Sequence, residues 1–204
     1  MTAAHQPRRP LQVVADEDDA GPASQDSWRA HAAIDQYSAE HQFVGSLMWL
    51  PAEKARPLVD LVPDTAIWRP LTRWAYESIR SLVDAGTDPT PPAVLDAGRR
   101  QPARDALDPA SPPTANQQRR LALYLFDAYA QAVAPAAAVE AYARKVLDAA
   151  YRRAFAACGT RMQHLAATAA DRDELAEQLS AIRDELADLW RRAEHAAKPQ
   201  RSQS

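Results

Sequence analysis

The feature that most constrains this chain is its longest stretch without proline. Sixteen prolines occur among the 204 residues, yet none lies between Ala136 and Lys198. Proline in a helix interior removes a backbone hydrogen bond and clashes with the preceding turn, which costs roughly 3 kcal/mol. A long run rich in alanine, leucine, glutamate and arginine but free of proline therefore predicts long helices. Possible capping residues near 169–173 divide the run, so we expect an antiparallel helical hairpin over 136–196.

Both arms of this hairpin carry apolar residues at helical spacing. The first arm has two apolar stripes, and a helix that is apolar on two sides must bury both. The second arm has a seam with alternating steps of four and three, which is typical of a heptad repeat. Such a seam is compatible with packing inside one chain and with contact between subunits. The hairpin residues that we assign to a dimer or partner interface are Leu147, Tyr151, Phe155, Met162, Leu175, Leu179, Ile182, Leu186, Leu189 and Trp190.

The same spacing indicates which side of the hairpin faces outward. We expect Ile182 to lie between the two arms. One contact between the arms and one contact with the rest of the chain use up both stripes of the first arm. Apolar side chains on the outer side, such as Trp190 or Met162, are then exposed in a monomer, and exposed apolar patches usually mark partner sites.

Upstream of the hairpin, apolar residues recur at steps of three and four in short stretches that prolines and glycines separate. No stretch alternates with a period of two for long enough to predict a strand. The expected fold is therefore all-α, with a small helical bundle followed by the long antiparallel hairpin. We expect a disordered N-terminal tail at 1–27, a globular helical subdomain at 28–135 and a C-terminal tail at 197–204.

Local signals place several helix ends in the subdomain. Ser38 suits an N-cap, and Pro57 and Pro70 suit the first position of a helix. Four prolines in the segment 101–118 predict a long surface loop. These signals give helices of two to four turns, which need each other to bury their apolar faces.

The helix that Pro70 opens has one clear apolar face. Trp74 lies on it, and Tyr76 lies off it. We therefore expect Trp74 to contribute more to stability than Tyr76.

Charge and hydropathy exclude several classes of protein. The net charge is −3 and the isoelectric point about 6.0, so no global basic field attracts nucleic acid or an acidic membrane. No run approaches the roughly 20 apolar residues that a membrane span needs, and the N-terminus lacks the apolar core of a secretory signal. These features predict a soluble, cytoplasmic protein that does not contact a membrane.

The residues that carry enzyme chemistry are thinly spread. None of the five glycines begins or ends the G-x-x-x-x-G-K-[ST] pattern of a phosphate-binding loop. The five histidines lack metal-ligand spacing, and the single cysteine, Cys158, lies on an apolar stripe as a buried hydrophobe would. We therefore expect no catalytic residue, no metal, no cofactor and no ATP hydrolysis.

Four stretches, taken in order, resemble the N-terminal domain of the bacterial replicative DNA helicase (DnaB) family. They are AEHQFVGSLM at 39–48, IWRPLTRWAYESI at 67–79, GTDPT at 86–90 and VEAYARKV at 139–146. The resemblance covers about residues 37–194. The chain departs from the family pattern in having a proline-rich loop where a Gly-Gly step is usual, and in lacking the usual Asn cap before the hairpin.

The resemblance implies that several of the quoted residues belong to the family's helix core. They are Phe43, Leu47, Trp68, Pro70, Arg73, Trp74, Ile79, Tyr142 and Arg144. In the family, this domain pairs through its hairpin, assembles into a ring-shaped collar and offers a docking surface for primase. Because no phosphate-binding loop is present, the chain resembles a stand-alone copy of the domain without its ATPase motor.

Two functions follow as hypotheses. The first is a non-catalytic interaction and oligomerisation module of DNA replication. It would form a homodimer or a higher ring and dock a replicative helicase, primase or helicase loader in a primosome. It would bind nucleic acid weakly or not at all. The second is a nucleic-acid-binding regulator built on a helical bundle. It would bind phosphates through pairs of arginines. The acidic or apolar neighbours of these pairs favour a simple solvated surface over a phosphate site. The pairs are Arg99 with Arg100, Arg119 with Arg120, Arg152 with Arg153, and Arg191 with Arg192.

Overall fold

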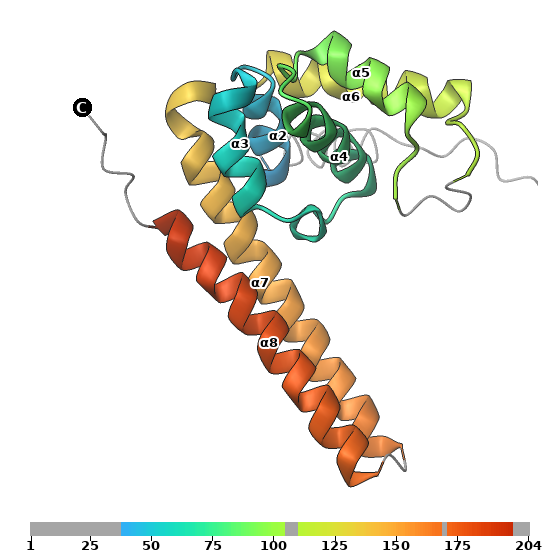
Figure 1. Cartoon of the computed structure of the whole chain (residues 1–204), viewed down its shortest axis with the longest axis vertical. Helices are drawn as coiled ribbons and strands as arrows, with labels where there is room; N and C mark the ends of the chain where they lie inside the picture. The colour runs from blue at the N-terminus through green and yellow to red at the C-terminus, as the bar shows by residue number, and fades with distance from the viewer. Residues whose placement is uncertain (1–37, 105–109, 169–170, 198–204) are drawn as a thin grey trace, which may run out of the picture. The chain divides into compact units, whose positions relative to one another are not determined.

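The computed structural model describes residues 38–104, 110–168 and 171–197. In these ranges the chain forms seven α-helices, one short 3-10 helix and no strand (Figure 1), which confirms the all-α prediction. The elements in chain order are α2 (Ala39–Leu47), α3 (Ala52–Leu61), η1 (Asp64–Ala66), α4 (Pro70–Asp84), α5 (Pro91–Arg100), α6 (Ala115–Ala130), α7 (Pro135–Ala167) and α8 (Arg172–Ala197).

Helix α7 belongs both to a helical bundle and to the hairpin. Its first half packs against α2, and apolar residues there, among them Val139, Val146 and Leu147, are part of the main core. Its second half leaves the bundle and runs beside α8 (Figure 1). The apolar residues expected on this arm are therefore only partly buried, since Phe155 and Met162 stay exposed.

Helix α4 is the centre of the bundle, because it contacts α2, α3, α5 and α6. Trp74 is buried, as expected, and its indole Nε1 donates to the Gln101 carbonyl at 2.9 Å. Tyr76, which lies off the apolar face in the sequence, is also fully buried, on the side that faces α3. A helix surrounded by four others has no solvent side along much of its length, so one apolar stripe does not identify all of its buried residues.

Several helix ends follow the local signals. The Ser38 side chain accepts a hydrogen bond from the amide of His41 at the start of α2, and Asp171 accepts from the amides of Asp173 and Glu174 at the start of α8. Gly86, just after α4, has the positive φ of 71° that glycine adopts without strain.

Two helix starts differ from the sequence prediction. Helix α3 begins at Ala52, and Pro57 lies inside it, because the Asp88 carboxylate accepts from the Ala52 amide at 2.8 Å and caps the helix from a distant part of the chain. Helix α6 begins within the segment predicted as loop, because Thr114 and Gln117 form a capping box.

The turn between α6 and α7 is backbone-strained at Ala134, whose φ of 47° lies in the left-handed region. This conformation costs a residue with a Cβ roughly 1–2 kcal/mol. We expect Ala134→Gly to raise the free energy of unfolding by about 0.5 kcal/mol, since glycine removes the strain but also loosens the unfolded chain. Urea denaturation measures the change, and a loss of stability would show that the turn is not strained.

The predicted tail at 1–27 lies outside the described residues, and so does the predicted tail at 197–204 except for Ala197, which is the last residue of α8. The predicted division into a subdomain and a hairpin stays a prediction, since all described residues belong to one compact unit. No single helix in the described ranges is long and apolar enough to cross a membrane; α6 and α7 pass that test only as a pair, bent by 115°.

Candidate interaction surface

The inner face of the hairpin is formed by a small number of buried residues. Ile182 is the buried residue of α8, as expected, and Cys158 is buried on the distal half of α7. Leu186 and Leu189 are half-buried. The Arg161 side chain of α7 donates to Cys158 Sγ at 3.3 Å and to Glu185 of α8 at 2.8 Å. The contact between the two arms is therefore narrow, and part of the apolar surface remains outside it.

Apolar side chains at the margin of this contact are exposed on both arms. Trp190 is 54% exposed and Phe155 is 62% exposed. The ring of Tyr151 lies between them, with its centroid 5.6 Å from Trp190 and 6.4 Å from Phe155. Because Tyr151 contacts both rings, the three aromatic side chains are continuous on one side of the hairpin. We call the hairpin patch the residues Tyr151, Phe155, Met162, Leu175, Leu179 and Trp190.

Helical geometry explains why part of the heptad seam is exposed. A straight α-helix drifts by about 20° per heptad relative to a repeat of 3.5 residues per turn. Ile182 and Leu189, two turns apart, lie on the covered side of the seam, whereas Leu179 and Trp190, three turns apart, lie on its exposed side. Leu179 is accordingly 59% exposed. On α7, Met162 follows Phe155 by two turns and is exposed with it.

The base of the hairpin is fixed to the bundle by arginine side chains. Arg192 donates to the carbonyl oxygens of Asp60 and Leu61 at 3.1 and 3.2 Å, at the C-terminal end of α3. Arg144 donates to the Ala196 carbonyl at the end of α8. Cations at helix C-termini are favourable, because they neutralise unpaired carbonyl groups. Arg192 is therefore a structural link and not part of the fully solvated face predicted for its pair.

The same arginine has an ion pair within α8. Arg192 Nε lies 2.7 Å from the Asp188 carboxylate, and Arg191 lies 3.4 Å from it. Hydrogen bonding from Arg192 lowers the pKa of Asp188 below its usual value. These charges keep the edge of α8 that approaches α3 polar, whereas the hairpin patch carries the exposed apolar residues.

The family-motif residues fall into two groups. Four of them, Phe43, Leu47, Trp74 and Ile79, are buried in the core. Trp68 is not a core residue, since 65% of its surface is exposed. Its neighbours Pro70 and Arg73 are exposed and half-buried, so the motif shapes a surface as well as a core.

Tyr142 and Arg144 serve as polar links near the root of the hairpin. The Tyr142 hydroxyl donates to the Val133 carbonyl at 3.1 Å, and the side chain is half-buried. Arg144 is exposed apart from its bond to the end of α8. Tyr142 packs against the edge of the hydrophobic core, whereas Arg144 lies outside it.

A pocket of about 290 Å³ opens at the start of α4 and α6. Its walls are largely apolar, with Gln117 and Arg120 as polar members. The lining residues are Pro70, Leu71, Trp74, Pro102, Ala103, Pro113, Gln117 and Arg120. Within the described ranges, no group of three His, Cys, Asp or Glu residues is placed to hold a metal ion. The exposed apolar surface of the hairpin is therefore the strongest candidate for a functional site, and it is a site for contact.

This helical bundle with a long hairpin is an all-α fold that has also been seen in part of a helicase. The fold is similar to that of the N-terminal domain of DnaB helicase from Mycobacterium tuberculosis, with a TM-score of 0.55 and 22% sequence identity over 74% of this chain and 94% of that chain. No protein-family model and no curated protein sequence matches the chain.

Proposed function

We propose that this chain is a non-catalytic interaction and oligomerisation module of DNA replication, which pairs with a second copy through the hairpin patch. The observation that carries the proposal is the aromatic cluster of Tyr151, Phe155 and Trp190, which joins the two arms and leaves Phe155 and Trp190 exposed in the monomer. Aromatic residues are enriched at the centres of protein interfaces, where they contribute most of the binding energy.

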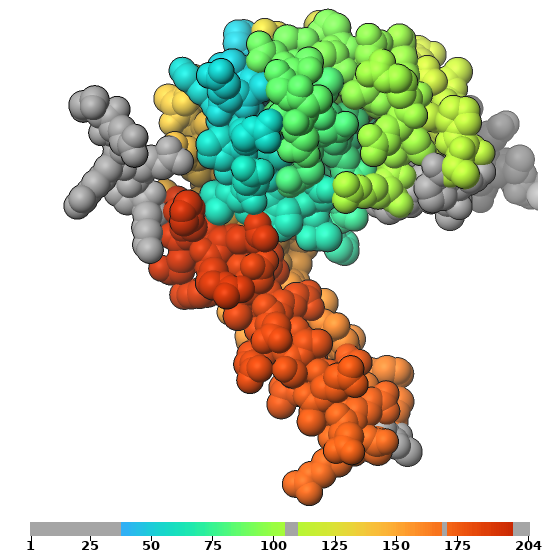
Figure 2. All heavy atoms as spheres, viewed as in Figure 1, coloured from blue at the N-terminus to red at the C-terminus, as the bar shows by residue number. Residues whose placement is uncertain are grey.

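A two-fold contact fits the shape of this surface. In an isologous dimer the same patch meets itself, so both partners bury the same apolar residues. The exposed apolar residues lie along the hairpin from Trp190 to Leu175. Figure 2 shows the hairpin projecting beyond the bundle. Association then covers Phe155, Leu179 and Trp190, which folding alone leaves in water.

The partners in replication follow from the similarity in fold and from the family resemblance. A module with this fold would join or cap a ring of a replicative helicase, or bind a primase or helicase loader. The structure favours this role over that of a regulator that binds nucleic acid through its arginine pairs. Arg153 and Arg192, one member each of two pairs, donate to backbone carbonyls within the chain.

Trp190→Asp tests the pairing. We expect the wild type to sediment as a dimer at micromolar concentration and the variant to be a monomer with unchanged helical circular dichroism. A symmetric interface buries the introduced carboxylate twice per dimer without a partner. The dissociation constant should therefore rise by at least about 100-fold, which corresponds to roughly 3 kcal/mol. Analytical ultracentrifugation over a concentration series measures it.

Two control variants separate association from folding. Ala181→Asp introduces the same charge at an exposed position two and a half turns before Trp190, on the opposite side of α8, and should leave the dimer intact. Ile182→Asp places a charge between the arms and should reduce helical content. A wild type that remains monomeric at hundreds of micromolar, or equal effects of Trp190→Asp and Ala181→Asp, would contradict the proposal.

A further inference from the structure

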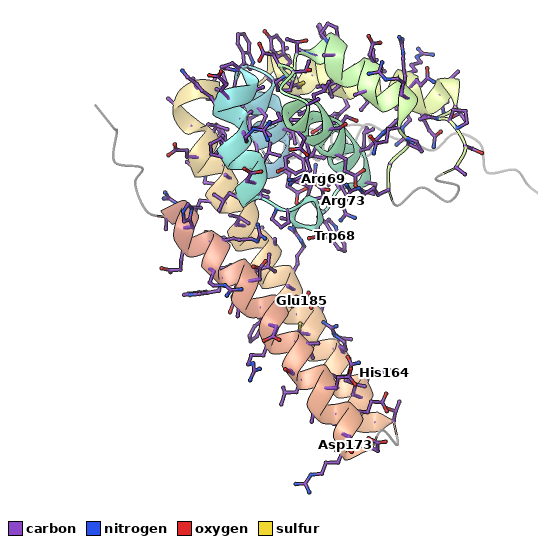
Figure 3. All side chains as sticks on the ribbon, in the orientation of Figure 1. Trp68, Arg69, Arg73, His164, Asp173 and Glu185 are labelled. Atoms are coloured by element: carbon purple, nitrogen blue, oxygen red, sulfur yellow. The ribbon has the colours of Figure 1, made fainter. Side chains whose placement is uncertain are left out.

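The pocket of about 290 Å³ at the start of α4 and α6 is a second candidate site, separate from the hairpin patch. The buried side chain of Trp74 lines it together with the half-buried Leu71. In Figure 3 the labels Arg69 and Arg73 mark the start of α4, whose first turn forms one wall. None of the described residues that line the pocket belongs to α7 or α8. The pocket is therefore a feature of the bundle alone.

The wall that follows α5 is held at both of its ends. The Trp74 indole donates to the Gln101 carbonyl at 2.9 Å, just before this wall begins. The backbone amide of Arg104 donates to the Glu77 carboxylate at 3.1 Å, just after it ends. The lining segment 102–103 lies between these two anchors. Its position is therefore set by α4, whose residues supply both partners.

The wall that precedes α6 is also fixed. Pro113 is buried, and its carbonyl accepts from the Gln118 side chain at 2.9 Å. Three of the lining residues are prolines, whose rings hold the backbone φ angle. The pocket is therefore preformed, and a preformed site lowers the entropy cost of binding a ligand.

Two side chains of α6 supply hydrogen-bond donors to this pocket. Arg120 is exposed, and its guanidinium forms no hydrogen bond or ion pair with the part of the chain that the structure describes. Gln117, one turn earlier, uses its Oε1 to accept from Thr114 in the capping box, so its amide N–H groups can donate to a ligand. None of the described lining residues is acidic. A guanidinium beside apolar walls favours a ligand that joins a carboxylate to an apolar group.

The size of the pocket restricts the apolar part of that ligand. Sites for drug-sized molecules usually measure about 300–1,000 Å³, so a pocket of about 290 Å³ fits one bulky apolar side chain. The last residue of a protein chain carries such a side chain and a carboxylate on the same Cα. An internal residue has no backbone carboxylate, and the chain on both sides of it needs room outside the pocket. A chain end is therefore the better fit.

We propose that this pocket binds the C-terminal end of a partner protein whose last residue is large and apolar. The last side chain enters between Leu71, Trp74 and the proline walls, and the terminal carboxylate accepts from Arg120 and Gln117. Binding of a chain end through its carboxylate is a recurring mode of peptide recognition. It uses no residue of the hairpin patch, so the pocket and the pairing of two copies can be tested separately.

Fluorescence anisotropy with the full chain and a fluorescein-labelled peptide tests the site. The peptide consists of glycine and serine and ends in phenylalanine with a free carboxylate, and the same peptide with a C-terminal amide is the comparison. We expect the amide to bind at least about tenfold more weakly, because it loses a charge-assisted hydrogen bond to arginine. Arg120→Ala should remove this difference, so that both peptides bind with the low affinity of the amide.

Arg119→Ala is the matched control, because Arg119 is the adjoining exposed residue of α6 and carries the same charge but does not line the pocket. It should bind as the wild type does. Ala103→Leu places a larger side chain in the pocket and should weaken the binding of both peptides.

Three results would overturn the proposal: no saturable binding by the wild type, equal affinity for the carboxylate and amide peptides, or an equal loss in Arg119→Ala and Arg120→Ala. Displacement of the peptide by an equal concentration of phenylacetate would also overturn it, because the ligand would then be a small aromatic acid and not a chain end.

Discussion

Replacing Tyr76 with alanine is expected to lower the free energy of unfolding by about 4 kcal/mol, the range measured for large aromatic residues in well-packed cores. Tyr76 is fully buried between α4 and α3. Its removal leaves a cavity and also withdraws the hydroxyl that donates to the Val62 carbonyl at 2.6 Å. The urea midpoint, followed by circular dichroism, measures the loss.

Two further variants divide this effect into its parts. Burial raises the pKa of Tyr76 well above its usual range, so the phenol stays protonated and donates at any ordinary pH. Tyr76→Phe removes only the hydroxyl, and Arg80 still donates to the same Val62 carbonyl at 2.6 Å. We therefore expect Tyr76→Phe to cost about 1 kcal/mol.

An exposed aromatic residue provides the comparison for Tyr76. Phe126→Ala, at a surface position, should change the free energy of unfolding by no more than about 0.5 kcal/mol. If Tyr76→Ala costs no more than Phe126→Ala, the packing of α3 on α4 described above is wrong.

Tyr76 also shows where reasoning from the sequence stops. The apolar stripe of α4 correctly places Trp74 and Ile79 in the core. It misses Tyr76, as well as Thr72 and Ser78, which are polar yet buried. These residues are buried because several helices surround α4. Hydrophobic periodicity identifies the apolar face of a single helix, but it does not tell how many neighbours that helix has.

Helix ends were predictable where the capping group is local. Ser38 and Asp171 cap helices that begin within three residues of them. The start of α3 at Ala52 depends on Asp88, which lies 36 residues further along the chain. A cap supplied by tertiary structure leaves no local sequence signal, and for this reason Pro57 was read as a helix start.

The candidate site was predictable in part for the same reason. Helical spacing places Ile182 inside the hairpin and Trp190 and Met162 outside, as observed. Helical spacing does not distinguish Leu179 from Ile182, because both lie on one heptad seam. The seam drifts around the helix, so the other arm covers only part of it. Trp68 gave the opposite error, because a residue of a core motif is exposed. Glu40 of α2 holds its amide, and Arg153 of α7 holds the nearby Ala66 carbonyl.

The second large effect is expected at Gly45, where α2 passes closest to α6. A Cβ on this residue would lie 2.1 Å from the backbone oxygen of Ala128 and 2.9 Å from its carbonyl carbon. Real Cβ atoms do not approach backbone this closely, so the two helices would have to separate. The side chain of Gln42 opposes such a shift, because it donates to the Gln131 carbonyl at 3.1 Å and accepts from the Val133 amide at 2.9 Å.

Gly45→Ala should therefore destabilise the protein by about 2 kcal/mol, as overpacking does, although alanine is the better helix former by about 1 kcal/mol. Gly159 is the matched control: it also lies inside a helix, α7, but a Cβ there meets nothing within 4 Å. Gly159→Ala should raise the free energy of unfolding by about 0.5–1 kcal/mol. Both are best measured by urea denaturation in the Trp190→Asp background, so that association does not contribute. Helix propensity alone would change the free energy of unfolding in the same direction at both positions. If both variants change it with the same sign, α2 and α6 do not approach as closely as the structure shows.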